Sequence, residues 1–593
     1  MIRDFNMLDF LRTTVHGHSL ALVLALMVGA LYAAPHVYFA HTPAYRGIYM
    51  AESSDEDFYM TTINKISYSG GIVGNPYLFE YQNIGNPFQY YGAEFALAKV
   101  KTLFHLSIAE LAIAMKLVFP AALFLLMYLF FYTLAGTKQL ALLGSTAVML
   151  GNELAQSGVH DVAATFLLRS PFTDFLTYAR PINPSVSGLF FFGAFISLLY
   201  LLRNPRSKWA IGVSALLLGL LAYLYVFFWV FACVLLGVMF LYAALTRNKI
   251  LCLAAVVTGV IGIGISLPFL FALLSSVHGS TSESLFAVPT HRFIVEKVIL
   301  IPLFIFTCIY GYEWWQRRRG RASAVLSAFT QKYMFVFLLL IAGELVSNQQ
   351  VITGRLVQPH HFHFYINIPL FLIASSLLFY AVLEQYLPRF KNLLIGVSIL
   401  FLFAYGAGVQ ISSYRAHEPA YVQYQNYSPA LAWLNASGGG KVVLTDEYLA
   451  TRVTMYTNDF VYVGPTDLAY QVPFLRLEHD YFVLLYLRGV RSDTVRAYVY
   501  TPSNRDEISV LLVGAEYYRD LCGSYSCFPD SKLESLIADY KVFLKQPFET
   551  QLTQYRVDYV LWDKTANPEW HLEQFPFLQK VYDAEGIAIY QVK

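Results

Sequence analysis

Residues 209–245 read WAIGVSALLLGLLAYLYVFFWVFACVLLGVMFLYAAL, about 37 residues without one charged side chain. A transmembrane helix needs about 20 apolar residues, so this stretch is too long for one span and short for two. It is expected to form either two helices joined by a tight turn near residues 223–225 or one helix followed by a re-entrant segment. Both structures need lipid around them, so this stretch predicts an integral membrane protein.

The composition of the whole chain agrees with a polytopic membrane protein. Of 593 residues, 57% are hydrophobic and 13% are charged, whereas soluble globular proteins carry nearer a quarter charged residues. The formal net charge of +2 is too balanced to indicate a nucleic-acid partner. Membrane lipids are the expected surroundings, and no nucleic acid is expected.

Apolar runs of spanning length recur along the chain. The first follows Arg3 and Arg12 and is too long for a signal-peptide core, so it is expected to remain as a transmembrane helix. About eleven spans are expected, at residues 19–40, 109–135, 139–155, 185–202, 209–223, 226–245, 250–274, 294–315, 333–347, 363–384 and 392–411.

The basic residues predict the orientation of these spans. With the N-terminus in the cytoplasm, every short basic loop falls on the cytoplasmic side, as the positive-inside rule requires. The residues in these loops are Lys138, Arg203, Arg206, Lys208, Arg247, Lys249, Arg317, Arg318, Arg319, Arg321, Arg389 and Lys391. The outer side then receives loops 41–108, 156–184, 275–293 and 348–362, together with the C-terminal tail.

The expected fold is an all-α polytopic membrane domain over residues 1–411, followed by a small extracytoplasmic α/β domain over residues 412–593. In the tail, ALAWLNASGGGKVVLTDEYLATRV predicts a helix, a glycine turn, a strand and a second helix. DSKLESLIADYKVFLKQ predicts a helix, YRVDYVLWD a strand, and residues 583–586 the turn of a terminal hairpin. Cys522 and Cys527 are candidates for a disulfide in an oxidising compartment.

Three consecutive acids, Asp55, Glu56 and Asp57, follow the first span in AESSDEDFYM. One interpretation is structural: Ser53 or Ser54 caps a helix whose first turn holds the acids, because negative charge suits a helix N-terminus. The other is catalytic: a carboxylate at the membrane surface acts as general base on a hydroxyl acceptor. Asp55 and Glu56 are then also candidate ligands for a divalent cation, Mg²⁺ or Mn²⁺.

The second outer loop carries His160, Asp161, Arg169 and Asp174, and ends in RPINPS with Arg180 and Asn183. Arg180 either anchors the chain at the lipid headgroups or binds the phosphate of a lipid-linked donor through its guanidinium fork.

The third and fourth outer loops hold further polar candidates. TSESLFAVPTHRF carries Glu283, His291 and Arg292, and GRLVQPHHFHFY carries Arg355 and Gln358. His360, His361 and His363 follow, and they are candidates for a structural zinc site, for packing on lipid or protein, or for hydrogen bonds to a diphosphate or sugar. The chain contains no GxxxxGK[ST], G-x-S-x-G, HExxH or paired CxxC motif, so no nucleotide cofactor is expected.

From residue 19 to 155 the chain resembles the GT-C fold of integral-membrane glycosyltransferases, in particular the bacterial branch related to protein mannosyltransferases and aminoarabinose transferases. The resemblance rests on one span followed by an Asp-Glu pair with Tyr59 after it, on NPFQYYGAEF, and on LAGTKQLALLGSTAVMLG. It implies that Asp55 or Glu56 is the catalytic base and, in some branches, a metal ligand. Asp57 departs from the pattern and leaves open which carboxylate acts.

Two functions are therefore expected, of different kinds. The first is a glycosyltransferase that moves a sugar, with inversion, from a polyprenyl-phosphate donor to a glycan, lipid or protein acceptor on the outer face. In it, Arg180, Arg355, His360 and His361 bind the donor phosphate. The second is a non-catalytic membrane protein that exports or anchors a surface polysaccharide, with the C-terminal domain as binding module. The spans hold few charges apart from Lys116, Glu153 and Glu344, which favours chemistry at the surface over transport through the core.

Overall fold

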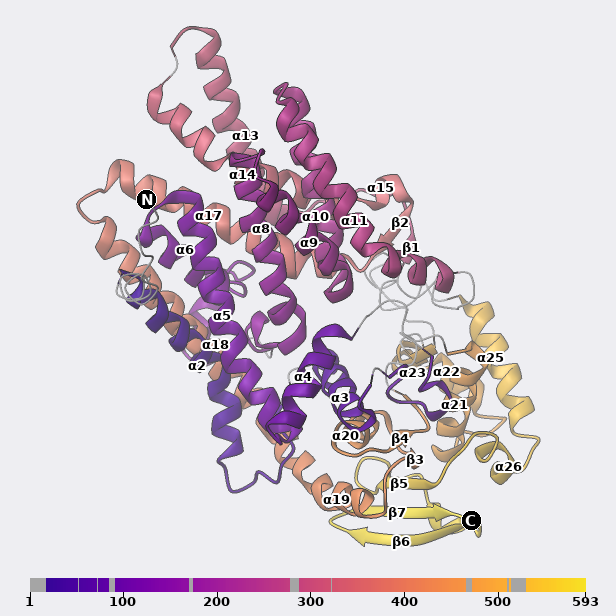
Figure 1. Ribbon diagram of the computed structural model, residues 1–593. Helices are drawn as coiled ribbons and strands as arrows, with labels where there is room; N and C mark the ends of the chain where they lie inside the picture. Colours follow the sequence, from indigo (N-terminus) through magenta and orange to yellow (C-terminus); the bar gives the residue numbers. More distant parts are fainter. Residues whose placement is uncertain are drawn as a thin grey trace.

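The computed structural model describes residues 17–51, 53–71, 73–84, 91–169, 174–277, 287–321, 323–464, 472–508, 511–512 and 529–593. A long bundle of apolar helices carries a smaller mixed α/β unit at one end (Figure 1). The expected fold class, a helical membrane domain followed by a small α/β domain, is confirmed.

Each of the eleven expected spans coincides with an apolar helix in the described part of the chain. The helices are α2 (Ser19–Ala40), α5 (Ile108–Ala135), α6 (Lys138–Leu150), α8 (Ser187–Arg203), α9 (Lys208–Leu224), α10 (Val226–Leu245), α11 (Lys249–Val277), α13 (Lys297–Arg318), α14 (Ala324–Ser347), α17 (Ile368–Tyr386) and α18 (Lys391–Tyr424). Nine of them are long and apolar enough to cross a membrane, whereas α6 and α9 are shorter.

The uncharged stretch 209–245 forms two helices, α9 and α10, as one of its two interpretations predicted. Tyr225 separates them with an extended backbone, φ −159° and ψ 106°. The chain therefore reverses direction at Tyr225, and this residue lies at the end of the bundle rather than inside it.

Glycines allow several of these helices to pack closely. A Cβ at Gly29 of α2 would lie 2.3 Å from the carbonyl oxygen of Leu117 in α5. On α9, a Cβ at Gly219 would lie 2.5 Å from Ile265 of α11. In a membrane, small residues at such positions let backbones approach and gain van der Waals contact.

The two ends of the bundle differ in charge. Because the helices alternate in direction, the loops that hold Lys138, Arg203, Lys249, Arg317 and Lys391 lie together, and we call this the basic end. The longer segments between spans and the α/β unit lie at the opposite end, which we call the α3 end after helix α3 (Ser54–Ser69).

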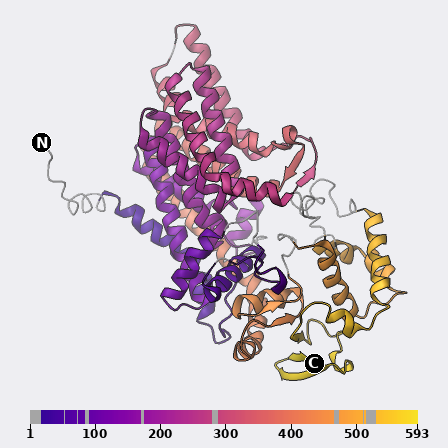
Figure 2. The same ribbon diagram turned by 45° about the vertical axis from the view of Figure 1, so that its right-hand side comes forward.

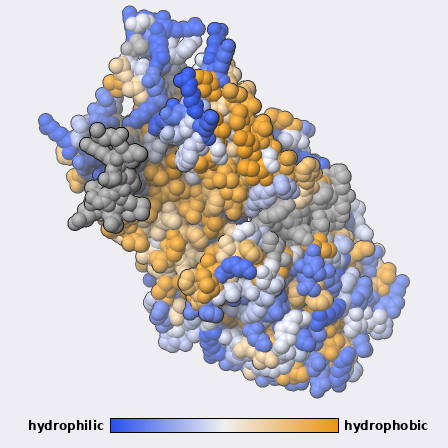
Figure 3. Space-filling view, viewed as in Figure 1, coloured by the Kyte–Doolittle hydropathy of each residue, from blue (hydrophilic) through white to orange (hydrophobic). Residues whose placement is uncertain are grey.

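On the face shown in Figure 3, a belt of hydrophobic surface covers the bundle between these two ends. Large apolar side chains such as Leu26, Val260 and Phe304 are exposed there, and a contiguous apolar surface of this kind is not stable in water. The belt is the lipid-facing surface of an integral, multi-pass membrane protein.

The C-terminal unit is built on a five-stranded sheet of order β4-β3-β5-β7-β6. Strand β3 pairs in parallel with β4 and β5, and β5, β7 and β6 pair antiparallel. The strands are β3 (Val442–Leu444), β4 (Phe460–Val461), β5 (Tyr559–Asp563), β6 (Leu578–Ala584) and β7 (Ile587–Val592). The helices of this unit are α19 (Ser428–Ala436), α20 (Glu447–Tyr456), α21 (Phe474–Leu487), α22 (Val495–Tyr500), α23 (Pro502–Ile508), α25 (Asp530–Phe543) and α26 (Phe548–Leu552). Every element expected from the tail sequence is present.

Helix α18 continues past the expected boundary at residue 411 and ends at Tyr424, so one helix leads directly from the membrane into the C-terminal unit. The remaining short elements lie between spans at the α3 end. They are η1 (Phe79–Tyr81), α4 (Gly92–Leu103), α7 (Val159–Phe166), η2 (Thr177–Ala179), η3 (Pro181–Val186), β1 (Ala287–Pro289), α15 (Gln350–Thr353), β2 (Arg355–Val357), α16 (Pro359–Phe362), η4 (His363–Asn367), η5 (Gln425–Tyr427) and η9 (Leu572–Gln574).

Helix α3 packs against α20 of the C-terminal unit, as both views of the ribbon show (Figure 1, Figure 2). Asn64 donates to the carbonyl oxygen of Thr457 at 3.1 Å. Lys65 is buried, donates to the carbonyl oxygen of Asp459 at 2.5 Å, and lies 3.9 Å from the centre of the Phe460 ring. The first long loop and the C-terminal unit therefore share one core.

The burial of Lys65 predicts that this packing is pH-dependent. Burial lowers the pKa of its amine to about 7, against about 10.4 in an unfolded chain. Between these values the unfolded state binds a proton that the folded state lacks, so stability rises with pH, by up to about 1.4 kcal/mol per pH unit. Below about pH 7 both states are protonated and the slope disappears.

We expect the melting temperature of the purified protein to rise between pH 7 and 9 more steeply for wild type than for Lys65→Met, measured by intrinsic fluorescence. Because other groups titrate equally in both proteins, the difference between the two slopes isolates Lys65. Equal slopes would mean that the amine is charged or solvated in the folded protein.

Candidate active site

Helix α3 places the three acids in its first turn. Ser53 is the N-cap, with extended backbone, and its hydroxyl accepts a hydrogen bond from the amide of Glu56 at 3.4 Å. Successive residues of an α-helix are rotated by about 100° from one another. Asp55, Glu56 and Asp57 therefore point in three directions, and each meets a different cation.

Glu56 forms a buried ion pair with Lys116 of α5. The Lys116 Nζ lies 2.9 Å from a Glu56 carboxylate oxygen, and both side chains are 0% exposed. Lys116 also donates to the carbonyl oxygen of Ala179, at 3.1 Å, one residue before Arg180. This pair joins α3, the membrane bundle and the second long loop, and it leaves Glu56 inaccessible to substrate.

Asp57 forms an ion pair with Arg452 of α20, at 2.6 Å, and both side chains are mostly buried. Arg452 also donates to the Tyr421 hydroxyl at 3.3 Å. Burial is the largest single influence on the pKa of the Arg452 guanidinium and would lower it, but the facing Asp57 carboxylate and the groups around it together raise that pKa. Burial also raises the pKa of the Asp57 carboxyl, against the effect of Arg452. The contact joins α3 to the C-terminal unit.

Asp55 is the accessible acid of the three. Its side chain is 50% exposed, whereas that of its partner Arg180 is 17% exposed. Arg180 donates through Nη2 to the Asp55 carboxylate and through Nη1 to the Tyr365 hydroxyl. These two bonds use two of the five N–H donors of a guanidinium, and the buried Nε has no partner among the described residues.

Aromatic and amide side chains surround this pair. Tyr225, at the α9–α10 junction, shares a hydrogen bond with Nδ1 of His361. The His361 ring stacks on Phe227 with 4.3 Å between ring centres, and its centre lies 5.8 Å from that of Tyr365. These contacts bring the α9–α10 junction and the segment that follows β2 to the position of Asp55.

A second hydrogen bond couples α3 to the chain just after Arg180. Asn183 donates through Nδ2 to the Tyr59 hydroxyl at 3.0 Å. The Asn183 side chain is buried, and its Oδ1 has no partner among the described residues. We define the candidate active site as Asp55, Tyr59, Arg180, Asn183, Tyr225, His361 and Tyr365.

The structure thus brings four candidate site residues chosen from the sequence into one group, Asp55, Arg180, Asn183 and His361, together with Tyr59, which the sequence offered only as part of the GT-C resemblance. Sequence reasoning did not select Tyr225 and Tyr365, although Tyr225 lies at the predicted turn and Tyr365 follows the histidine run. It also used Lys116 only as a rare charge within a span, and it did not select Arg452.

The other selected residues lie elsewhere at the α3 end. Nδ1 of His363 forms a hydrogen bond with the Glu296 carboxylate at 3.0 Å. His160 is almost fully exposed, and Asp161 accepts from the amide of Gly158 at the start of α7, at 3.0 Å.

The hairpin of β1 and β2 carries a second group. Arg355 pairs with Pro289 across the strands, and its side chain is exposed, as are those of Arg292 and His360. Gln358 adopts a left-handed backbone, φ +36°, before α16. Glu283, Cys522 and Cys527 lie outside the described residues, so the expected disulfide stays a prediction.

The described residues do not form a preassembled set of protein ligands for a divalent cation. Asp55 and Glu56 diverge, and Lys116 and Arg180 already neutralise them. His361 and His363 bond to Tyr225 and Glu296, so they diverge as well. No group of three His, Cys, Asp or Glu side chains with metal-binding geometry occurs in the described part of the chain.

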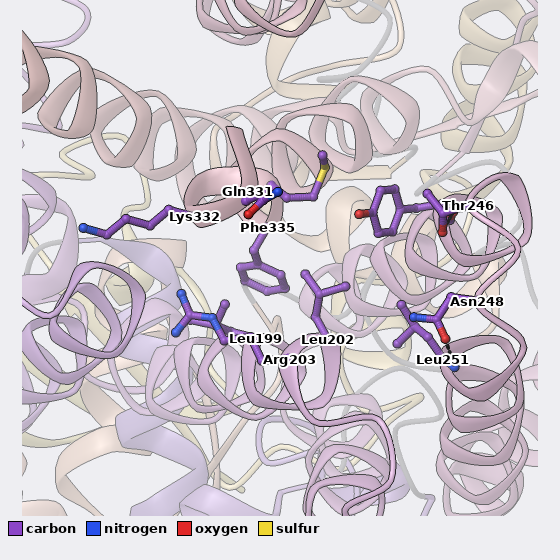
Figure 4. Close-up of a pocket in the computed structure, with 11 residues that line it drawn as sticks. Leu199, Leu202, Arg203, Thr246, Asn248, Leu251, Gln331, Lys332 and Phe335 are labelled. Atoms are coloured by element: carbon purple, nitrogen blue, oxygen red, sulfur yellow. Dashed lines mark hydrogen bonds between the residues drawn. The ribbon is translucent and has the colours of Figure 1, made fainter. Parts of the chain in front are cut away.

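A cavity of about 330 Å³ lies at the basic end, between the ends of α8, α10, α11 and α14 (Figure 4). Leu199, Leu202 and Phe335 line its middle, with Arg203 and Lys332 beside them (Figure 4). None of the residues that line it belongs to the candidate active site.

No family model and no curated protein matches the chain. Among solved structures, the chain is similar to the oligosaccharyltransferase of Archaeoglobus fulgidus in its apo form, with a TM-score of 0.49 at 12% identity over 97% of this chain and 74% of that one. It is also similar to ArnT from Cupriavidus metallidurans bound to undecaprenyl phosphate, with a TM-score of 0.47 at 13% identity over 77% of this chain and 87% of that one.

The same archaeal oligosaccharyltransferase, tethered by a disulfide bond to an acceptor peptide with the NVT sequon, gives a TM-score of 0.45 at 13% identity over 98% of this chain and 74% of that one. At these identities and scores, the likeness assigns no reaction, donor or acceptor to this chain.

The ion pairs of α3 give a testable prediction about stability. Removing one partner of a buried ion pair leaves an unpaired charge and costs about 3–5 kcal/mol, whereas replacing both partners by neutral groups costs much less. We therefore expect Lys116→Met to lower the melting temperature strongly, and Glu56→Gln combined with Lys116→Met to recover part of the loss. Additive effects in this double-mutant cycle would contradict the ion pair.

Proposed function

We propose that the chain is a GT-C-type membrane glycosyltransferase that moves a sugar from a polyprenyl-phosphate donor to an acceptor hydroxyl. The observation that carries the proposal is the accessible carboxylate of Asp55, held by Arg180 where the apolar bundle meets the C-terminal unit, while Tyr365 accepts from the other terminal nitrogen of Arg180. A lipid-linked donor needs such a place, because its tail requires the bundle and its sugar requires water. The resemblance of residues 19–155 to GT-C enzymes supports the same function.

Asp55 is the general base in this proposal. Its carboxylate takes the proton of the acceptor hydroxyl while the oxygen attacks the anomeric carbon of the donor sugar. The bond from that carbon to the phosphate oxygen breaks on the opposite face, and its electron pair leaves with the polyprenyl phosphate. The product therefore has inverted configuration. Glu56 and Asp57 cannot take this role while they stay buried in ion pairs.

Arg180 binds the departing phosphate. Two of its donors hold Asp55 and Tyr365, and a guanidinium has further N–H groups for phosphate oxygens. Fixed donors directed at developing charge stabilise a transition state without reorganisation. The Tyr225 hydroxyl and the Asn183 amide are further candidates to bind phosphate or sugar. In this proposal Arg180 supplies charge compensation for the departing phosphate.

The proposed orientation follows from the basic residues. Lys138, Arg203, Lys249, Arg317 and Lys391 all lie at the basic end, which the positive-inside rule places in the cytoplasm. The N-terminus is then cytoplasmic, and the candidate active site and the C-terminal unit face the outer side. The donor sugar would be loaded inside and presented outside, and a glycan, lipid or protein would be the acceptor.

We expect Asp55→Asn to lower the transfer rate by about 10²–10⁴-fold, the usual contribution of a general base, while the loss of its half-exposed ion pair with Arg180 lowers the melting temperature only slightly. The assay follows labelled sugar from polyprenyl-phosphate-linked mannose, glucose or aminoarabinose into membrane glycans of cells that make the protein.

Asp493→Asn is the matched control, because Asp493 is an exposed acid of the C-terminal unit. It should transfer at the wild-type rate. If Asp55→Asn transferred at the wild-type rate too, Asp55 would not be the base.

A further inference from the structure

A cavity of about 290 Å³ lies between the C-terminal half of α3, the segment 73–82 and the loops before β3 and β4. Its volume is close to the lower limit of about 300 Å³ for small-molecule sites in proteins. It does not include any residue of the candidate active site. We call it the α3–β4 pocket.

The walls of the α3–β4 pocket are held in place by backbone hydrogen bonds. In the first wall, the amide of Gly74 donates to the carbonyl oxygen of Gln82 at 2.7 Å. A Cβ at Gly74 would lie 2.2 Å from the carbonyl oxygen of Ile84, so only glycine fits this turn. The amide of Val461 donates to the carbonyl oxygen of Tyr77 at 2.9 Å and joins this wall to β4. The pocket is therefore formed before any ligand enters.

The side chains in the pocket combine aromatic rings with amides. Phe79 and Phe460 meet edge to face, with 5.4 Å between ring centres, and Tyr68 adds a third ring. The side-chain amides of Gln82 and Asn458 also line the pocket. An amide offers both donors and an acceptor, which is what a sugar hydroxyl needs, while aromatic rings pack on the C–H face of a sugar ring. This combination matches a carbohydrate.

The charge in the pocket favours a neutral ligand. Lys65 is the one acidic or basic side chain among the described residues that line it. Its amine is already bonded to the carbonyl oxygen of Asp459 and lies over the Phe460 ring. Because burial lowers its pKa to about 7, much of the positive charge is absent at neutral pH. A second cation, Arg556, lies 4.4 Å from the centre of the Phe79 ring, but it is paired with Asp558 at 3.0 Å. An anionic sugar would therefore find little attraction here.

The position of the pocket relates it to Asp55. The lining residues Lys65, Tyr68 and Ser69 follow Asp55 by ten to fourteen positions on the same helix, and a helix rises about 1.5 Å per residue. The pocket thus lies roughly 15–20 Å from Asp55 along α3. A ligand that reached both places would have to be an oligosaccharide rather than a monosaccharide.

We propose that the α3–β4 pocket binds a neutral sugar unit of an oligosaccharide acceptor, at a distance from the unit that receives the new sugar. This inference rests on the proposed transferase function for its role, but the binding site itself does not. It makes the C-terminal unit, through the loops before β3 and β4, a part of acceptor recognition.

Binding of neutral disaccharides to the full chain tests the proposal. The protein is placed in lipid nanodiscs, because maltoside detergents carry sugar headgroups, and saturation-transfer NMR is recorded with cellobiose, 1,6-mannobiose and N,N′-diacetylchitobiose. We expect at least one to bind with a millimolar Kd. Asn458→Leu and Gln82→Leu should each weaken it at least tenfold, and the matched control Gln554→Leu, at an exposed position of the C-terminal unit, should leave it unchanged.

The proposal is overturned if none of the three disaccharides binds, or if binding survives both pocket substitutions. Asn458→Ala replaces Asn458→Leu if the leucine variant has a lower melting temperature. Asp55→Asn should bind the disaccharide as wild type does. If Asp55→Asn loses transfer and no disaccharide binds, the proposal for the α3–β4 pocket fails and the proposed transferase function stands. If disaccharide binds and Asp55→Asn transfers at the full rate, Asp55 is not the base, and the proposal for the α3–β4 pocket stands.

Discussion

The first turn of α3 presents three carboxylates to three cations, and the architecture of the α3 end depends on these pairs. Glu56 meets Lys116 in the bundle, Asp57 meets Arg452 in the C-terminal unit, and Asp55 meets Arg180 in the second long loop. A helix turns by about 100° per residue, so consecutive acids cannot share one partner. One short sequence thereby joins three parts of the chain that are distant in sequence.

Burial separates the roles of the three acids. A fully buried ion pair such as that of Glu56 is costly to break, since either partner alone would be an uncompensated charge. The pair at Asp57 fixes the C-terminal unit on α3 in the same way. Asp55 differs because half of its side chain is exposed and its partner has further donors. The two buried pairs thus fix the helix, and the third leaves one carboxylate available for chemistry.

The sequence predicts the positions of the apolar helices well because apolar length is a local property. Each of the eleven expected spans coincides with an apolar helix, and nine of these helices are long enough to cross a membrane in the described part of the chain. The turn at Tyr225 and the terminal hairpin also lie where the local sequence predicts them. It also selects the acids and Arg180 by their place just beyond a span. It cannot assign a role to each acid, because Lys116 and Arg452 are 60 and 395 residues away from their partners. The structural interpretation of the acids is confirmed, because Ser53 caps the helix, whereas the catalytic interpretation stays a prediction, now centred on Asp55 beside Arg180.

Arg355 is a residue that the sequence selects but that the fold places away from Asp55. Its loop is as polar as that of Arg180 and also precedes a span, but it lies on the β1–β2 hairpin rather than in the ion pair with Asp55. Which arginine meets the acids depends on packing between distant segments, and a local pattern does not contain that information. For the same reason, Tyr225 and Tyr365 could be identified as site residues only from the folded structure.

The most direct test of the central claim is a cryo-EM map of the protein in nanodiscs with undecaprenyl phosphate added. If Arg180 binds the donor phosphate, the map will show phosphate density within hydrogen-bonding distance of Arg180, beside Asp55, with the lipid tail along the bundle. Phosphate bound instead at the basic end, beside Arg203 and Lys332, with Asp55 and Arg180 unchanged and unoccupied, would contradict this claim.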